Sequence, residues 1–400
     1  MKLNKDLIVS FAIYGLGLLC VLLADLHVSS NFSDFKVAEW AFIKSTVLIV
    51  GTFCLLGYDQ IFIRDQSLIK RFYLKFLFQS CIIAILLIVL LMCVKGYIFK
   101  NAALISICVL LLAVLSYFSS ASRANFHLWK SQFSTNFWKI ILLFGLYLFE
   151  GVDAVYYFLF ALAIGTAISI PLKGFIPNPE NETCVKLSDK EAIAISSAFL
   201  LHNMTLIFAI YGEQFIINLS NDVEASSHLF KYTAVFTPIA LSLNGFLGFY
   251  FAPKVRKDNN MSIPRYWKFS KNILLYSVLV TIFSAFAGIL YMIFYINIPV
   301  GDLDIFLILS LSFMCITRGL YITTSVCLGV FGDAKDLRSA AVITGTCTLF
   351  YLISIFIILL YFKGITAAWF ISLATLGNWL LRLIISNKFT FKTLKRLQYA

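Results

Sequence analysis

Charged side chains are scarce in this sequence. Asp, Glu, Lys and Arg make up 13% of its 400 residues, and there are only seven prolines and four histidines. Soluble domains carry about 25% charged residues. Hydrophobic residues reach 60%, and they gather in recurrent apolar runs of about 20 residues, the length needed to cross a bilayer. This scarcity of charge excludes the soluble globular class and predicts an all-α polytopic membrane protein.

The sequence also lacks the local motifs of common enzymes. It has no Gly-Lys-Ser/Thr phosphate loop, no His-Glu-x-x-His, no Gly-x-Ser-x-Gly and no Cys-x-x-Cys, so it offers no recognisable site for ATP, zinc or a nucleophilic serine. All nine cysteines except Cys184 fall in apolar runs, where thiols behave as small apolar groups. We therefore expect no enzyme, no cofactor and no metal ion.

The apolar runs predict about twelve spanning helices. One segment between them, 173–189, is polar and contains two of the seven prolines. It divides the predicted helices six and six, so we expect an N-terminal lobe at 1–172, a cytoplasmic linker at 173–189 and a C-terminal lobe at 190–400. The predicted spans lie near 7–25, 37–58, 72–94, 102–121, 136–149, 152–172, 191–219, 229–251, 269–297, 304–329, 339–361 and 364–386.

The positive charges predict the topology. Most of the 32 Lys and Arg residues fall in the even-numbered loops and the two ends of the chain, and basic loops stay on the cytoplasmic side. Both termini are therefore expected in the cytoplasm, with membrane lipids rather than nucleic acid as the partner of the net charge of +12. Four tryptophans at predicted span ends fit the headgroup zone: Trp40, Trp129, Trp138 and Trp267.

A few polar residues inside the predicted spans are candidate functional groups, because charge at membrane depth is costly. Arg318 lies far from both ends of its span, on a stripe with Tyr321. Lys44 begins a second stripe that reaches Tyr58, with Glu39 one turn further out. In the seventh span, His202 is central and Glu213 lies toward the outer side. Glu213 could bind a proton or sodium ion, or it could neutralise Arg318 or Lys44.

Two stretches resemble the polysaccharide flippase family, which carries O-antigen and other lipid-linked oligosaccharides and belongs to the multidrug/oligosaccharidyl-lipid/polysaccharide transporter superfamily. One is Gly57-Tyr-Asp-Gln-Ile-Phe-Ile-Arg64, where an apolar run after the second span is closed by Arg. The other runs from Glu213 through Tyr232 and Pro238 to Lys254. Where the family usually has Gly before the Tyr, this chain reads Leu229-Phe-Lys-Tyr232.

The resemblance implies two six-helix lobes around a central cavity that opens alternately to each side of a bacterial cytoplasmic (inner) membrane. The cargo would be an undecaprenyl-pyrophosphate-linked glycan, such as an O-antigen or capsule repeat unit, and a glycan polymerase is a possible partner. A pyrophosphate favours arginine forks in a low-dielectric cavity. The candidate cargo-binding residues are Arg318, Lys44, Arg64, Arg123, Tyr58 and Tyr321.

Two other functions stay open. The first is cation-coupled export of drugs or other small molecules on the same architecture, with Glu213, His202 and Glu39 as possible coupling groups. The second is a membrane enzyme of glycan assembly, either a polymerase or an acyltransferase. Short predicted outer loops disfavour the enzyme, because such loops usually hold the substrate.

Overall fold

A computed structural model describes residues 5–62, 65–125, 127–149, 151–170, 188–242, 244, 261–332 and 334–399. The regular secondary structure of the described residues is all helical, with no β-strand among them. Contacts divide the chain into two compact units, unit 1 at Met1–Asn221 and unit 2 at Asp222–Ala400. The expected division at a linker stays a prediction, because 171–187 lies outside the described residues.

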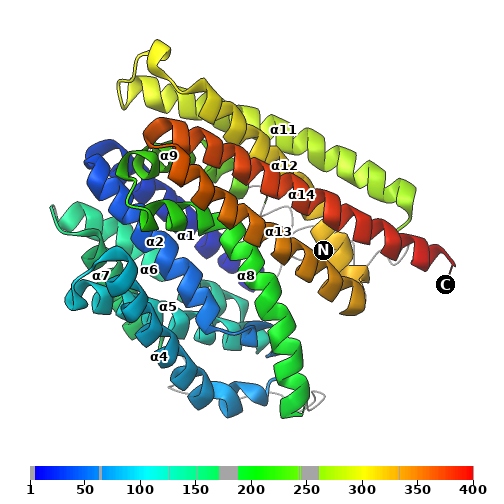
Figure 1. The fold of residues 1–400 in the computed structure, drawn as a ribbon. Coiled ribbons are helices and arrows are strands. Elements are labelled where there is room, and N and C mark those ends of the chain that lie inside the picture. The colour runs from blue at the N-terminus through cyan, green and yellow to red at the C-terminus, as the bar shows by residue number, and fades with distance from the viewer. Residues whose placement is uncertain are drawn as a thin grey trace. The chain divides into compact units, whose positions relative to one another are not determined.

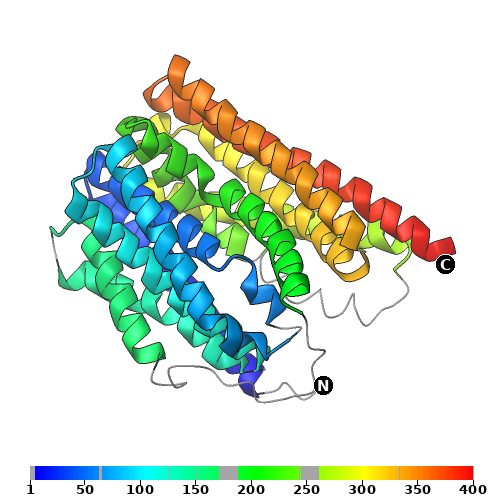
Figure 2. The ribbon, with the colours of Figure 1, turned by 60° about the horizontal axis from the view of Figure 1, so that its bottom comes forward.

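The described residues of unit 1 form eight helices, which run from blue through cyan to green in Figures 1 and 2. They are α1 (Lys5–Asn31), α2 (Asp34–Cys54), the short α3 (Tyr58–Ile61), α4 (Leu68–Lys95), α5 (Phe99–Ala124), α6 (Leu128–Leu148), α7 (Ala154–Ser169) and α8 (Asp189–Leu219). Unit 2 contains α9 (Val223–Phe236), α11 (Ile263–Phe294), the 3-10 turn η1 (Val300–Asp302), α12 (Ile305–Phe331), α13 (Ala334–Tyr361) and α14 (Gly364–Tyr399).

The predicted membrane class is confirmed. Each predicted span has a helix at its place in the chain, and in the described ranges nine helices are long and apolar enough to cross a membrane. The other three predicted spans correspond to α6, to α7 and, only in part, to α9, which ends at Phe236; 245–251 of the span predicted near 229–251 lies outside the described residues. Several helices extend past the predicted ends: α1 continues to Asn31, and α14 continues to Tyr399. The chain is therefore a multi-pass integral membrane protein.

In unit 1, α1 packs on α6, and α2 packs on α5 and α8. Glycines allow two of these contacts to be close. A Cβ added to Gly17 on α1 would lie 2.5 Å from the Cβ of Asn136 on α6. A Cβ on Gly51 would lie 2.9 Å from a methyl carbon of Leu112 on α5. Absence of a side chain at these positions lets helix backbones approach.

A left-handed elbow ends α2. Leu56 has φ of 48° and Gly57 has φ of 77°, a conformation that glycine adopts without strain. A Cβ on Gly57 would lie 2.3 Å from the carbonyl oxygen of Ser196 on α8, and the Ser196 hydroxyl donates to the carbonyl of Leu56. The stripe predicted from Lys44 to Tyr58 is therefore wrong as one helical face, because Tyr58 begins α3 after this reversal.

The far end of α8 is also held within unit 1. The Lys95 ammonium at the end of α4 donates to the carbonyl of Asn218 and to Oδ1 of Asn221. The same ammonium lies 5.2 Å from the ring centroid of Phe42, and that ring stacks on Phe215 of α8 at 6.0 Å. A cation at a helix C-terminus is favoured by the helix dipole. Contacts near both ends thus fix α8 to α2, α4 and the elbow.

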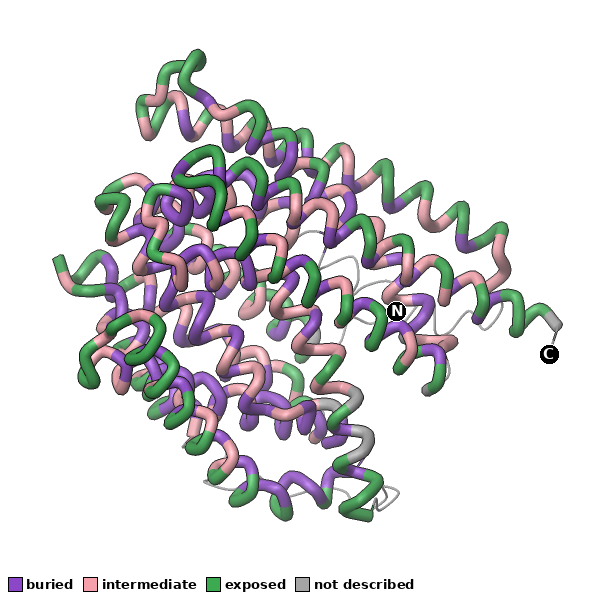
Figure 3. Tube along the Cα trace, in the orientation of Figure 1, coloured by how far each residue is buried: buried purple, intermediate pink, exposed green. Residues whose placement is uncertain are grey.

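In unit 2, α12 packs against α11 and α14, and α14 packs against α13 (Figures 1 and 2). Buried and exposed residues alternate along α11, as Figure 3 shows, because one side packs on α12 and the other faces outward. Gly319 permits this packing, since a Cβ there would lie 2.1 Å from the Ser277 hydroxyl. Pro238 follows the end of α9 at Phe236, consistent with the helix break expected of proline.

Two of the four predicted interfacial tryptophans are buried instead. Trp40 and Trp138 are 0% and 3% exposed. The interfacial prediction is wrong for these two, since both rings pack inside unit 1 near Phe158, and the Trp40 indole also donates to a buried carboxylate. Trp267 is 58% exposed, as an interfacial ring should be.

Candidate functional site

A buried ion pair joins α1 to α2 in unit 1. Asp25 on α1 is 5% exposed. Its Oδ1 accepts a hydrogen bond from the Trp40 indole at 3.0 Å, and its Oδ2 pairs with the Lys44 ammonium. Trp40 and Lys44 stand one turn apart on α2 and so face the same side. Both oxygens of a carboxylate at membrane depth are thereby occupied.

A polar layer on α6 adjoins this pair. The Lys139 ammonium donates to Oδ1 of Asn136 at 2.7 Å, and the Asn136 amide donates to Oε1 of Gln132 at 2.9 Å. Lys139 also repels Lys44 electrostatically. The close approach of α6 to α1 at Gly17 brings Asn136 into this layer. The result is a cluster of two ammonium groups and a carboxylate inside unit 1, built from α1, α2 and α6.

The chemistry of this cluster is set by the balance of its charges. A buried ion pair is stable only while both partners are present, and removal of one partner costs about 3–5 kcal/mol. A proton on Asp25, or a metal cation on its oxygens, would remove the negative charge that attracts Lys44 in this pair. The contact between α1 and α2 therefore depends on the charge state of Asp25.

A second cluster lies in unit 2, around Trp379 of α14. The guanidinium of Arg318 on α12 lies 4.6 Å from its ring centroid, and that of Arg382 lies 5.6 Å away. Tyr321 meets the same ring edge-on at 5.7 Å. Arg382 is 0% exposed, and it donates to the Thr348 hydroxyl of α13 at 3.4 Å. The structure thus brings together Arg318 and Tyr321, as the sequence stripe predicts.

Three buried polar atoms border this second cluster. Trp379 Nε1 and both amide atoms of Asn378 have no hydrogen-bond partner among the described residues, although both side chains are 2% exposed. Buried polar atoms are normally hydrogen-bonded. They therefore mark a place where a polar group of a ligand, or water, would find partners beside two guanidinium groups.

The other predicted cargo-binding residues lie elsewhere. Tyr58 is buried, and its hydroxyl donates to Oε1 of Gln79 at 2.8 Å. Arg123 lies 3.8 Å from a carboxylate oxygen of Asp59 and donates to the Asp59 carbonyl at 3.3 Å. Arg64 lies outside the described residues. Tyr58 and Arg123 thus both belong to the elbow region after α2 in unit 1, whereas the Trp379 cluster belongs to unit 2.

The predicted coupling residues are spread over unit 1. Glu213 on α8 is 6% exposed, and His202 on the same helix is half-buried. Glu39 on α2 lies close to Asp153 and the backbone of Ala154 at the start of α7. Lys44 forms an ion pair with Asp25, so Glu213 is not needed to neutralise its charge. The described residues contain no group of three His, Cys, Asp or Glu side chains placed to hold a metal ion.

Sequence reasoning missed Asp25, Trp379 and Arg382. The predicted first span stopped at residue 25, so Asp25 was read as a span end. Arg382 lies close to the end of the predicted span 364–386, so the charge pattern assigns it, like Lys139, to the predicted inner side. In the structure α14 runs on to Tyr399, which leaves Arg382 inside the packed unit. The spacing of Asn378, Trp379 and Arg382, one helical turn, was the available signal.

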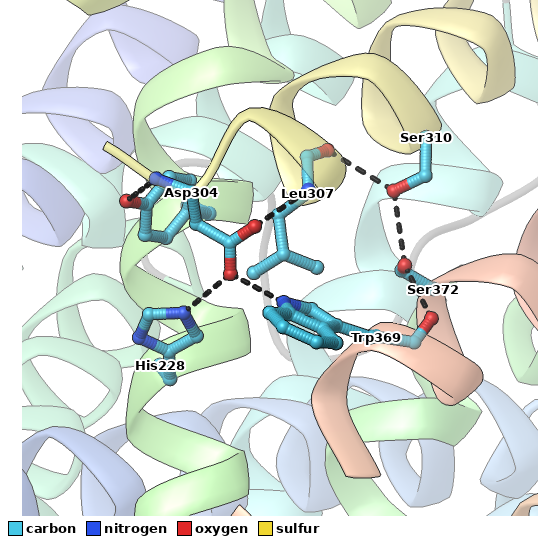
Figure 4. A network of polar contacts seen from close by, with 7 residues as sticks. His228, Asp304, Leu307, Ser310, Trp369 and Ser372 are labelled. Atoms are coloured by element: carbon cyan, nitrogen blue, oxygen red, sulfur yellow. Dashed lines mark hydrogen bonds and ion pairs between the residues drawn. The ribbon is translucent and has the colours of Figure 1, made fainter. Parts of the chain in front are cut away.

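A further network closes one end of unit 2 (Figure 4). Asp304, the N-cap of α12, accepts from the backbone of Leu307 at 3.0 Å. Its other oxygen accepts from Trp369 of α14 at 2.6 Å and contacts His228 of α9 at 2.9 Å. The backbone N–H of Asp304 donates to the Tyr232 hydroxyl at 2.8 Å. One carboxylate thus ties together α9, α12 and α14.

Comparison with known proteins identifies the fold. No known protein family and no curated protein sequence matches the chain. Among solved structures, it is similar to an inward-facing conformation of a multidrug resistance MATE family transporter of the MOP superfamily, with TM-score 0.55 and 13% identity over 99% of this chain and 100% of that one. It is also similar to a crystal structure of MATE in complex with MaD5, with TM-score 0.51 and 11% identity over the full length of both chains.

These likenesses show that the chain has the MATE fold over its whole length. The likeness is to MATE structures, and at these identities it is a likeness of fold alone. Both neighbours are MATE proteins, and the first is a transporter.

Proposed function

We propose that the chain is an alternating-access transporter that exports small organic molecules and is driven by a cation gradient across a bacterial cytoplasmic membrane. The observation that carries the proposal is the buried Asp25–Lys44 pair in a chain with the MATE fold. A transporter coupled to a cation needs a group inside the membrane whose charge changes on binding. Asp25 is such a group, because a proton or sodium ion on it competes directly with Lys44.

The coupling step follows from the contacts. With Asp25 ionised, Lys44 and Trp40 hold α2 against α1. When a cation neutralises Asp25, Lys44 loses the attraction of this carboxylate while Lys139 repels it, so the contact between α1 and α2 weakens. A ligand can shift a conformational equilibrium only through a difference in affinity for the two states. Rearrangement of this contact supplies that difference. We keep Glu213, His202 and Glu39 as further proposed coupling groups, ranked after Asp25.

The Trp379 cluster supplies the proposed cargo preference. Arg318 is only partly buried, so it can reach cargo, whereas Arg382 is fully buried behind the same ring. Guanidinium groups bind carboxylates and phosphates through paired hydrogen bonds. We expect an anionic organic cargo, held by Arg318 with Tyr321 and Trp379 against its apolar part.

The same cluster favours a second candidate, a flippase for an undecaprenyl-pyrophosphate-linked glycan that would act with a glycan polymerase. Arg318 would bind the pyrophosphate, and Tyr321 the sugar. Lys44 and Arg123 would reach cargo only by leaving Asp25 and Asp59. Arg64 and Tyr58 complete the proposed set for this cargo.

Transport in energised membrane vesicles tests the first candidate. Vesicles with the chain should move a fluorescent organic anion such as carboxyfluorescein when a proton or sodium gradient is imposed. Asp25→Asn should abolish the dependence on the gradient, and Arg318→Ala should lower uptake about tenfold or more, with Arg318→Lys intermediate. Matched controls are Asp302→Asn and Arg338→Ala, which remove exposed charges of unit 2.

The two candidates are separated by a second assay. In a host whose surface glycan depends on this chain, the flippase predicts loss of surface glycan with Arg318→Ala and no movement of the fluorescent anion by the unmodified protein. Gradient-driven anion transport that survives Asp25→Asn unchanged would show that Asp25 is not the coupling group.

A further inference from the structure

A half-open cavity of about 570 Å³ lies within unit 2, between α11, α12 and α14. Its size is in the range of small-molecule and lipid sites. Apolar side chains from three helices form its wall: Leu274 of α11, Leu320 of α12 and Leu383 of α14. The Trp379 cluster is formed by other residues, so this cavity is not part of the candidate cargo site.

The inner surface of the cavity is polar but satisfied. The Tyr266 hydroxyl of α11 donates to Oδ1 of Asn387 on α14, and the Ser270 hydroxyl donates to Thr323 of α12 at 3.4 Å. Tyr266 is 2% exposed. These bonds tie the three helices together around the cavity, so its shape is built by the fold. With their polar groups engaged, Tyr266 and Ser270 add to a lining suited to an apolar occupant.

The rim of the cavity is basic and aromatic. Lys268 and Lys271 are both exposed and stand one turn apart on α11. No carboxylate of the described residues pairs with either lysine. Trp267 lines the same cavity, rests on Phe391 with ring centroids 5.4 Å apart and is 58% exposed. An exposed Trp beside lysines is typical of the headgroup layer.

The rim lies on the side that the charge distribution predicts to be cytoplasmic. Lys268 and Lys271 belong to the basic segment that precedes α11 and enters it. Thr323 and Asn387 lie in the C-terminal halves of α12 and α14, and the C-terminal ends of these helices are also expected in the cytoplasm. The cytoplasmic leaflet carries the anionic lipids of a membrane, and basic pockets between helices on this side bind their headgroups.

We propose that this cavity binds one anionic phospholipid of the cytoplasmic leaflet. Its phosphate lies between Lys268 and Lys271, Trp267 covers the glycerol region, and an acyl chain enters along Leu274, Leu320 and Leu383. The combination of a charged rim and an apolar interior selects a lipid over a soluble phosphate. The site bridges α11, α12 and α14, so an occupied cavity stabilises the packing of unit 2. This proposal is independent of the transported cargo.

Native mass spectrometry of the detergent-purified chain tests the proposal, with phosphatidylglycerol and phosphatidylcholine as probes. We expect one phosphatidylglycerol to be retained in preference to phosphatidylcholine. Lys268→Gln with Lys271→Gln should weaken phosphatidylglycerol binding about tenfold or more, because each basic residue near an anionic headgroup contributes. The matched control is Lys335→Gln with Lys395→Gln, which removes two exposed lysines of the same unit outside the cavity.

Two further arms identify the occupant. Leu274→Trp fills the cavity from a partly exposed position, so it should displace the lipid while the protein stays folded. Glycerophosphoglycerol, which has the headgroup without acyl chains, should not compete. Competition by that soluble headgroup, equal retention of both lipids, or equal loss in the control pair would each overturn the proposal.

Discussion

Lys44 on α2 and Asp25 on α1 form an ion pair inside unit 1, with the Trp40 indole on the second carboxylate oxygen. Each charge of the pair lowers the cost of placing the other at this depth. A buried ion pair is weak evidence for added stability, but replacing one partner without the other is strongly destabilising.

Asp25→Asn should therefore lower the free energy of unfolding by about 3–5 kcal/mol, because the Lys44 ammonium keeps its desolvation penalty and loses this carboxylate. Asp25→Asn combined with Lys44→Met should recover most of the loss. Unfolding of the purified protein in detergent, followed by intrinsic fluorescence, measures both variants. A double variant as unstable as the single one would refute the pairing argument.

Trp379 should be replaceable by another aromatic ring but not by an aliphatic side chain. Trp379→Phe keeps a π-face for Arg318 and Arg382, whereas Trp379→Leu removes it, so Leu should cost about 1–2 kcal/mol more than Phe. Thermal unfolding compares stability, and anion uptake by vesicles compares function. Equal behaviour of the two variants would mean that the ring serves only to fill space.

Gly57 and Gly151 provide a matched pair of left-handed glycines. Gly151 has φ of 78° with nothing within 4 Å of an added Cβ, so Gly151→Ala should cost about 1–2 kcal/mol from backbone strain alone. Gly57→Ala adds a collision with the Ser196 carbonyl at 2.3 Å and should cost at least twice as much. Unfolding midpoints of both variants test this, and equal costs would show that the α2–α8 contact relaxes freely.

Asp304→Asn should loosen one end of unit 2. The amide can still cap α12, but it presents only one acceptor oxygen to Leu307, Trp369 and His228, so about 2–3 kcal/mol should be lost. Hydrogen exchange should become faster at the adjoining ends of α9, α12 and α14. The control is Asp302→Asn, which changes an exposed neighbour in η1 and should leave hydrogen exchange unchanged. If this variant accelerated exchange to a similar degree, the effect would come from the loop before α12 and not from the Asp304 contacts.

Glu191 should make the start of α8 sensitive to acid. Hydrogen bonds from the hydroxyl and backbone N–H of Ser188 lower the pKa of Glu191 below its ordinary value. The resulting stabilisation is complete above that ordinary pKa of about 4.3 and is lost as pH falls through the lowered pKa. Ser188→Ala should flatten this part of the stability profile between about pH 3 and pH 6. An unchanged profile would contradict the capping box.

The helices were predictable because the bilayer fixes their length and composition, which hydropathy reports directly. Their inner details were not. The elbow at Leu56 and Gly57 lies within a continuous apolar stretch, so periodicity passed through it and joined Tyr58 to the face of Lys44.

Only some residues of the two functional clusters could be predicted from the sequence, again because hydropathy reports the helices but not their inner details. Arg318 stood out because its span is apolar on both sides, and Tyr321 followed from the helical repeat. Asp25 and Arg382 were assigned to span ends, because hydropathy locates the edge of a helix only within several residues and both helices run further. Trp379 carries no charge, so only the tertiary structure shows that two guanidinium groups meet on its ring.

The anchoring of α8 near both ends has a practical consequence for dividing the gene. A first fragment that stops at residue 172 would leave Gly57, Lys95 and Phe42 without the helix that they contact. A fragment that continues through Asn221 would keep every one of these contacts within a single polypeptide. Co-expressed halves should accordingly assemble from a cut after Asn221, where the first half already contains its complete set of helices.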